Sequence, residues 1–341
     1  MLRLRTLLSW LPGWLLLLAL ALPSLWVSAQ IVIGGKEPVE ASALVVVLGM
    51  VLRNAGRVPA VCLPGIKAAE KLLVLGIVLM GFGLDYHKVL GEGREILAII
   101  LVTMAVGGGA TFLLSRAAWL SLELSVLLAA GTCICGGTAV ALIAPLVKAK
   151  EEETSYAVAV IALWGVAAIL LYPAIAKLPV VASALHVTDT SFGIFAGTAI
   201  HSTPQVVGAG YVYSEAAGRT ATAVKLVRNC FMAPAALLIA LAFARRRSDG
   251  GRIHYAKAFP WFLFAFFLTS WIGTNGYVPK EQVKLLEQSG KFLIILGMAG
   301  VGLNTDLGSI RRVGLRPLLV GLLGALIVAG VSIGMIAVLH V

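Results

Sequence analysis

Charged residues are scarce in this chain, and their scarcity excludes most soluble folds. Only 13% of the 341 residues are Asp, Glu, Lys or Arg, whereas 60% are hydrophobic, and a soluble domain of this length needs far more polar surface. The alternation of polar and apolar residues that marks a membrane β-barrel is lacking too. Apolar stretches of about 20 residues instead recur between short charged loops. The composition therefore predicts an all-α polytopic membrane protein.

Acidic residues and cysteines are also few, and each shortage excludes a class of function. The 27 Lys and Arg residues outnumber the 16 Asp and Glu residues, but they are spread over many short loops, which argues against nucleic-acid binding. Among the four cysteines, Cys133 and Cys135 are too close for an ordinary disulfide and lack further ligands at zinc-site spacing. We therefore expect no metal, no cofactor and no nucleic-acid partner. A nucleotide-binding loop is lacking as well, so ATP is not an expected energy source.

Eleven apolar segments are predicted within a single integral membrane domain that covers residues 1–341. We expect about 10–11 transmembrane helices, two of them broken. The first segment, within residues 1–29, also has the basic start, apolar centre and small residues typical of a signal peptide, and both interpretations stay open. The segments lie near residues 11–29, 41–54, 69–85, 94–115, 121–147, 154–176, 191–213, 218–245, 257–274, 290–305 and 313–340.

The distribution of Lys and Arg predicts the orientation in the membrane. If all eleven segments cross and the N-terminus is cytoplasmic, the cytoplasmic loops hold 16 Lys and Arg residues and the opposite loops hold 9. Cytoplasmic loops carry the excess of positive charge in membrane proteins, and the strongest single marker is Arg245 to Arg247. We therefore expect a cytoplasmic N-terminus and a C-terminus outside.

Two weak internal repeats imply different relative orientations. The sequence LGIVLMGFGLD from Leu75 resembles LGMAGVGLNTD from Leu296, seven segments later, which implies inversion. The sequence GTCICGGTAV from Gly131 resembles GTAIHSTPQV from Gly197, only two segments later, which implies the same orientation if both segments cross. The two relations conflict unless one broken segment is re-entrant. The sequence leaves this conflict open.

The segment at 121–147 carries CICGGT at its centre, which is poor material for a continuous helix. Gly136 and Gly137 weaken the helix, and the hydroxyls of Thr132 and Thr138 can satisfy freed backbone groups. Broken helices in transporters point half-helix N-termini, the positive dipole ends, at a bound anion. Close helix packing through small residues accounts for the same glycines, so a substrate site and simple packing remain alternatives at this segment.

A polar run from His201 to Gln205 interrupts the apolar segment at 191–213, and Pro204 within it removes a helical hydrogen-bond donor. A lone buried histidine is usually structural. A run of His-Ser-Thr-Pro-Gln at membrane depth, however, favours residues that line a site. His201 is also a candidate proton carrier, because imidazole titrates near physiological pH.

Two basic residues, Lys225 and Arg228, lie three positions apart and hence on one helical face, with Asn229 adjacent. Snorkelling toward the membrane surface is the simpler explanation for cations near the start of a span. Intramembrane cations, however, tend to face the bundle interior or a cavity and to have a partner. Because the deep polar groups are cationic or neutral, the pattern favours an anionic substrate over a cationic one.

Five ordered motifs, LGIVLMGFGLDYHKVL, GTCICGGTAVALIAPLVKAKEEE, FGIFAGTAIHSTPQVVGAGYVYS, VKLVRNCFMAPAALL and LGMAGVGLNTDLGSIRRVGLRPLL, resemble the signatures of a family of bacterial inner-membrane proteins proposed to be sulfate exporters. The resemblance covers nearly the whole chain. It implies a distant relation to bile-acid, arsenite and riboflavin carriers and to cation–proton antiporters, and hence crossed broken helices in a core beside a panel. The family usually has Ala or Ser at Gly137 and Thr138, and commonly an acidic residue where Ser202 stands.

Together these observations predict a secondary transporter of a small anion, such as sulfate or an organosulfonate, that works by alternating access coupled to a proton or ion gradient. Export is compatible with this prediction, but the sequence leaves the direction of transport open. The expected partners are this anion and the lipid bilayer, and a homo-oligomer stays open. Three alternatives remain: an anion channel, a membrane enzyme that uses Cys133 or Cys135 as nucleophile with His201, and a sensor or scaffold. The predicted substrate-binding residues are Thr132, Cys135, Gly136, Gly137, Thr138, His201, Ser202, Thr203, Gln205, Lys225, Arg228 and Asn229.

Overall fold

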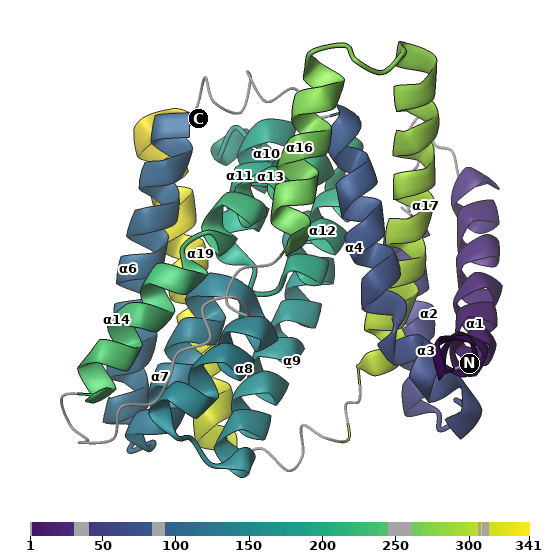
Figure 1. Ribbon diagram of the computed structural model, residues 1–341. Coiled ribbons are helices and arrows are strands. Elements are labelled where there is room, and N and C mark those ends of the chain that lie inside the picture. Colours follow the sequence, from purple (N-terminus) through teal and green to yellow (C-terminus); the bar gives the residue numbers. More distant parts are fainter. Residues whose placement is uncertain (1, 31–40, 84–92, 245–260, 306–307, 309–313) are drawn as a thin grey trace. The chain divides into compact units, whose positions relative to one another are not determined.

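The structure, a computed structural model, describes residues 2–30, 41–83, 93–244, 261–305, 308 and 314–341, and all regular elements in these ranges are helices (Figure 1). Seven helical stretches of the described residues are long and apolar enough, by length and composition, to cross a membrane. The prediction of an all-α polytopic membrane protein is therefore confirmed. The orientation marker Arg245 to Arg247 lies outside the described residues.

The chain forms two compact units. Unit 1 comprises Met1–Val89, Tyr211–Glu215 and Phe262–Gly308, whereas unit 2 comprises Leu90–Gly210, Ala216–Trp261 and Ser309–Val341. The helices of unit 1 are α1 (Leu2–Gln30), α2 (Ala41–Asn54), α3 (Leu63–Lys67), α4 (Ala69–Met80), α16 (Trp261–Thr274, from its second residue) and α17 (Lys280–Asn304).

Unit 1 is held together by helices that approach closely at glycines. A Cβ added to Gly76 of α4 would lie 2.7 Å from the carbonyl oxygen of Gly290 in α17, and one added to Gly297 would lie 2.5 Å from Cβ of Leu73. Residues that ascend α4 therefore meet residues that descend α17, so the two helices are antiparallel. This is the relation that the first repeat predicts, and its glycines permit the close contact.

The first helix belongs to the same packing. A Cβ on Gly13 of α1 would lie 2.3 Å from the carbonyl oxygen of Cys62, and the Lys71 ammonium lies 4.0 Å from the centre of the Trp10 ring. A cation over an indole face is attracted by the ring's electrons. In this structure α1 is thus an integral helix of unit 1.

Unit 2 contains the two segments that the sequence predicts to be broken. Its helices are α6 (Gly93–Ala117), α7 (Leu122–Ala130), the π-helical turn η3 (Gly131–Cys135), α8 (Gly136–Val147), α9 (Glu151–Ala176), α10 (Pro179–Ala184), α11 (Asp189–Ala199), α12 (Thr203–Tyr213, up to Gly210), α13 (Glu215–Asn229, from Ala216), α14 (Met232–Ala244) and α19 (Leu315–Leu339).

The apolar segment at 121–147 turns back at its centre and forms a helical hairpin. Helices α7 and α8 lie side by side (Figure 1). A Cβ on Gly131 would lie 3.0 Å from a methyl carbon of Val140, whereas a continuous helix would separate these residues by about 13 Å along its axis. Ser121, just before α7, donates a hydrogen bond to the carboxylate of Glu153 in the first turn of α9. The chain therefore enters and leaves this hairpin at the same end of unit 2.

The apolar segment at 191–213 forms a second hairpin. A Cβ on Gly193 of α11 would lie 2.6 Å from Cβ of Thr220, and a Cβ on Gly210 of α12 would lie 2.8 Å from Cα of Gly218. The start of α11 and the end of α12 therefore both lie beside the first turns of α13. Helix α12 returns the chain to the end from which α11 departs.

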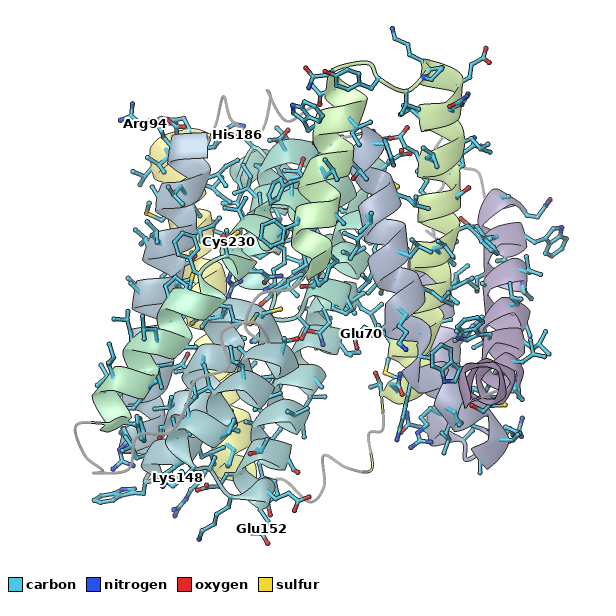
Figure 2. All side chains as sticks on the ribbon, in the orientation of Figure 1. Glu70, Arg94, Lys148, Glu152, His186 and Cys230 are labelled. Atoms are coloured by element: carbon cyan, nitrogen blue, oxygen red, sulfur yellow. The ribbon has the colours of Figure 1, made fainter. Side chains whose placement is uncertain are left out.

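The two hairpins enter unit 2 from opposite ends, because the 26-residue helix α9 separates them. Figure 2 shows Lys148 and Glu152, which follow the first hairpin, at one end of the unit, and His186, which precedes the second, at the other. Each copy of the second repeat thus consists of a hairpin and one crossing helix, and a single crossing inverts the next copy. The conflict between the two repeats disappears because both broken segments are re-entrant.

Candidate functional site

The first hairpin turns at a glycine that no other residue could replace without strain. Gly136 has φ 51° and ψ −131°, a conformation that is essentially restricted to glycine, and a Cβ there would lie 2.0 Å from Oγ of Ser202. The tip lies at mid-depth of the unit, since a Cβ on Gly108, halfway along α6, would lie 3.4 Å from Sγ of Cys133. The CICGGT break is therefore a sharp turn deep inside unit 2.

The second hairpin turns by a different device. Helix α11 ends at Ala199, and Ile200 is extended with φ −84° and ψ 145°. Pro204 occupies the first turn of α12, where a helix needs no N–H donor, so this proline starts a helix rather than kinks one. The side chain of Gln205 accepts a hydrogen bond from the Ser202 N–H at 3.2 Å and so closes that first turn.

The two tips contact each other. Beside the approach of Gly136 to Ser202, Sγ of Cys135 lies 3.4 Å from Oγ1 of Thr203. The Thr203 hydroxyl also accepts a hydrogen bond from Nδ2 of Asn229, at the end of α13, at 3.2 Å. The tips of both hairpins and the last turns of α13 therefore form one buried cluster.

Lys225 lies at the junction of the two tips. Its side chain is fully buried, and Nζ donates to the carbonyl oxygens of Ile134 at 2.9 Å, Ile200 at 3.1 Å and His201. An ammonium group has three N–H donors, so backbone carbonyls take all of them. Lys225 thus bonds one carbonyl of the first tip and two of the second.

Arg228, one turn further along α13 and equally buried, joins the same two tips. Nε donates to the carbonyl of Cys133 at 2.5 Å and Nη2 to that of Thr132 at 2.9 Å, both in the first tip. Nη1 donates to the carbonyls of Thr198 at 2.6 Å and Ile200 at 3.2 Å in the second. A guanidinium carries five N–H donors, and one donor on Nη2 is left over.

The carbonyls that these cations bind are the last ones of two helices. A helix C-terminus leaves its final carbonyls without intrahelical partners and carries roughly half a negative charge, and the ends of α7–η3 and of α11 both converge here. Buried cations therefore satisfy orphan acceptors and offset two dipole ends at once. Snorkelling is excluded, because neither side chain reaches the surface of the described structure.

Carboxylates take no part in this cluster within the described part of unit 2. The acidic side chains of that part lie in first helical turns at the ends of the unit, where they complement helix N-termini. Two roughly half-charges from the helix ends compensate two cations only in part, so the tips keep a positive excess. The acidic residues concerned are Glu95, Glu123, Glu151, Glu152, Glu153 and Asp189.

Three buried polar atoms of the cluster have no hydrogen-bond partner among the described residues: Oγ1 of Thr132, Nδ1 of His201 and Oδ1 of Asn229. Their residues are at most 2% exposed. Buried polar atoms are nearly always hydrogen-bonded. A hydroxyl, an imidazole nitrogen and an amide oxygen beside two cations are therefore suited to contact a polar ligand.

The contacts connect ten of the twelve predicted site residues, from Thr132 and Cys135 in the first tip to Asn229 at the end of α13. The other two lie apart from this network. Gly137 is half-buried, with Cγ1 of Val158 at 4.0 Å as the neighbour of an added Cβ, and Thr138 is exposed. The first turn of α8 is thus more open than the rest of the tip. Whether any of these residues binds substrate stays a prediction.

Besides the residues whose backbone carbonyls bind the two cations, three contributors to the cluster are not among the predicted residues. Ser332 of α19 is fully buried and bonds the hydroxyl of Thr198 at 2.7 Å. The carbonyl of Ala162 in α9 accepts from Nε2 of Gln205 at 3.2 Å, and Gly165, one turn on, leaves room for that side chain. A single serine within an apolar run could have signalled a polar contact, whereas a backbone carbonyl leaves no trace in a sequence.

The thiols of Cys133 and Cys135 have neighbours other than the imidazole of His201. Cys135 pairs with the Thr203 hydroxyl, and Cys133 lies against the glycines of α6. In the described ranges neither Sγ is hydrogen-bonded to His201. A cysteine nucleophile is normally activated by an adjacent base, so this arrangement does not favour the alternative of a cysteine enzyme.

The comparisons with known proteins agree with a membrane protein. Residues 12–321 match the family described as Conserved hypothetical protein 698. A UPF0324 membrane protein of Nitratidesulfovibrio vulgaris is 31% identical over 324 residues, which cover 91% of this chain and 88% of that protein. Another, from Clostridium tetani, is 31% identical over 278 residues, covering 77% and 79%. No solved structure matches the chain. The chain is therefore a multi-pass membrane protein that belongs to the Conserved hypothetical protein 698 family, with the UPF0324 membrane proteins as relatives.

Proposed function

We propose that the protein is a secondary transporter of a small anion, with sulfate or an organosulfonate as the first candidates. One observation carries the proposal: two re-entrant hairpins from opposite ends of unit 2 meet at two fully buried cations, without a carboxylate in the described cluster. Irregular backbone deep in a membrane protein persists where it lines a cavity or is buried in protein. An anion is the counter-charge that this centre lacks.

The anion would bind by the first turns of α8 and α12. The first N–H groups of a helix have no intrahelical partner and form the positive dipole end, and the half-open turn at Gly137 leaves room for a ligand. Lys225 has no free donor, so it contributes charge at a distance, whereas Arg228 keeps one N–H on Nη2. The unpartnered Oγ1 of Thr132 and Nδ1 of His201 are further candidate contacts.

Unit 2 would be the core that carries the anion, and unit 1 the panel. All residues of the proposed site belong to unit 2, and the two cations tie both tips to α13. Independent opening of one hairpin would break several charge-assisted hydrogen bonds, which are roughly twice as strong as neutral ones. Alternating access by movement of the core as one body avoids that loss.

Re-entrant hairpins also support the proposed orientation. If both broken segments are re-entrant instead of crossing the membrane, Lys148 and Lys150 lie on the cytoplasmic side and Lys177 lies on the outer side. The division of loop cations then changes from 16 against 9 to 17 against 8. This larger bias supports a cytoplasmic N-terminus and a C-terminus outside, in the inner membrane.

The test is uptake of radiolabelled sulfate into proteoliposomes, with and without a pH gradient, for wild type and for two isosteric variants. Thr132→Val removes an unpartnered hydroxyl, so it should leave the melting temperature unchanged while sulfate uptake falls severalfold or more. Thr111→Val is the matched control, because Thr111 is equally buried but bonds the Gly107 carbonyl of its own helix α6. It should leave uptake close to that of wild type.

Saturable uptake of sulfate, or of a sulfonate from a short panel, with selective loss in Thr132→Val would support an anion carrier with this site. Uptake that does not saturate would favour the channel. Equal uptake by Thr132→Val and wild type would remove the hydroxyl from the site. If wild type transports none of the anions under any gradient, the proposed function falls.

A further inference from the structure

The carbonyl oxygens at the two tips form a cation site that the chain itself fills. Ile134, Ile200 and His201 direct their carbonyls at Nζ of Lys225, and five further bonds run from Arg228 to carbonyls in or next to the two tips. Converging carbonyls of this kind at half-helix C-termini are the usual ligands of a coupling cation in transporters with broken helices. Here two side chains of a third helix occupy them.

A free metal cation would find no comparable site nearby. In the residues that the structure describes, no group of three or more His, Cys, Asp or Glu side chains could hold a metal ion. The acidic residues of unit 2 in those ranges stand in first helical turns, away from the tips. A cation that entered the tips would also meet two fixed positive charges, which repel it.

We infer that Lys225 and Arg228 are tethered cations that take the place of a coupling metal ion, so that both the assembly of the tips and transport are independent of Na⁺. The side chains lie on the face of α13 that contacts both hairpins, and they hold the tips together as a bound ion would. The transport part of this inference rests on the proposed function, whereas the part on tip assembly does not.

The first test uses the wild-type protein. Its melting temperature in detergent is measured in NaCl, KCl and N-methylglucamine chloride at equal ionic strength. A ligand that binds the folded state raises its stability. Because the tips are inferred to need no bound Na⁺, we expect the same melting temperature in all three salts. Stabilisation by Na⁺ alone, or uptake that requires Na⁺, would overturn the inference.

The second test removes each tether and supplies its missing part. Propylammonium matches the atoms that Lys225→Ala removes, and ethylguanidinium matches those that Arg228→Ala removes. We expect propylammonium at millimolar concentrations to raise the melting temperature of Lys225→Ala, and ethylguanidinium that of Arg228→Ala. Neither compound should stabilise the wild type or Lys284→Ala, an exposed lysine on α17.

A folded Lys225→Ala protein that does not respond to propylammonium would contradict the inference. If both variants fail to fold, the salt comparison on the wild type still decides. These readouts are melting temperatures, so an absence of transport would remove the proposed function and leave the tethered cations standing. If transport is found, propylammonium should also restore part of it in Lys225→Ala.

Discussion

The two hairpin tips reach the same point with different local chemistry. The first turns sharply at Gly136, whose combination of φ 51° and ψ −131° only glycine adopts without strain, and it presents apolar or weakly polar side chains. The second turns through extended Ile200 and the polar run from His201, and then restarts with Pro204 in a helical first turn. Both nevertheless give their last helical carbonyls to Lys225 and Arg228. The comparison teaches that the required feature is the exposed carbonyls rather than a particular turn.

Arg228→Ala should have the largest effect, because it affects both tips. It removes the side-chain donor of the Thr132, Cys133 and Thr198 carbonyls, whereas the Ile200 carbonyl keeps its bond from Lys225, and each buried unsatisfied polar group costs about 1–3 kcal/mol. We expect destabilisation of about 4 kcal/mol or more, seen as a much lower melting temperature and poor yield. Arg94→Ala, on an exposed arginine of α6, is the control and should behave like wild type. A normal melting temperature for Arg228→Ala would show that the cation is not needed for the tips to assemble.

Gly136→Ala should have the next largest effect and concerns the first tip alone. The substitution forces a strained backbone conformation, which costs about 1–3 kcal/mol, and displaces the hydroxyl of Ser202. Gly137→Ala is the matched control, since its added Cβ meets only Val158 at 4.0 Å and should cost little. Thermal unfolding of both variants measures the difference. Restoration of Gly136→Ala by a second change, Ser202→Gly, would attribute the loss to the clash rather than to strain.

The smallest predicted effect concerns the second tip, which Thr198 ties to Ser332 of α19. Single changes to Thr198→Val and Ser332→Ala should each cost about 1 kcal/mol, and the double variant should cost clearly less than the two together. A double-mutant cycle on unfolding free energies measures this coupling. Strict additivity would mean that the hydrogen bond contributes nothing to holding the tip.

Much of this architecture could be predicted from the sequence. The part that could not is the course of the chain after each break. Segment length and apolarity located the helices, and glycine and proline located both breaks. Those signals do not show whether the chain continues or turns back at a break, because a hairpin and a span of 25 residues have the same composition. The two repeats imply conflicting orientations unless the broken segments turn back. The positive φ of Gly136 and the return of α12 to α13 show that both segments do turn back.

The candidate site was predictable by residue but not by role. Lys225 and Arg228 were recognisable as intramembrane cations, yet the carbonyls that they bind belong to the backbone, which residue types do not reveal. Ser332 stands in an apolar run without a polar neighbour, so its bond to Thr198 was missed. Family membership is confirmed by the comparisons, whereas sulfate as substrate remains part of the proposal.

The most direct test of the account asks from which side of the membrane the flanks of each hairpin are reached. Single cysteines at the exposed positions Ala117 and Glu152 flank the first hairpin, and those at Ala184 and Ala216 flank the second. Each is labelled with a membrane-impermeant maleimide in intact cells and in inverted vesicles, against a background in which the native thiols do not react. We expect the first pair to be labelled from one side and the second pair from the other. Labelling of the two flanks of either hairpin from opposite sides would contradict it.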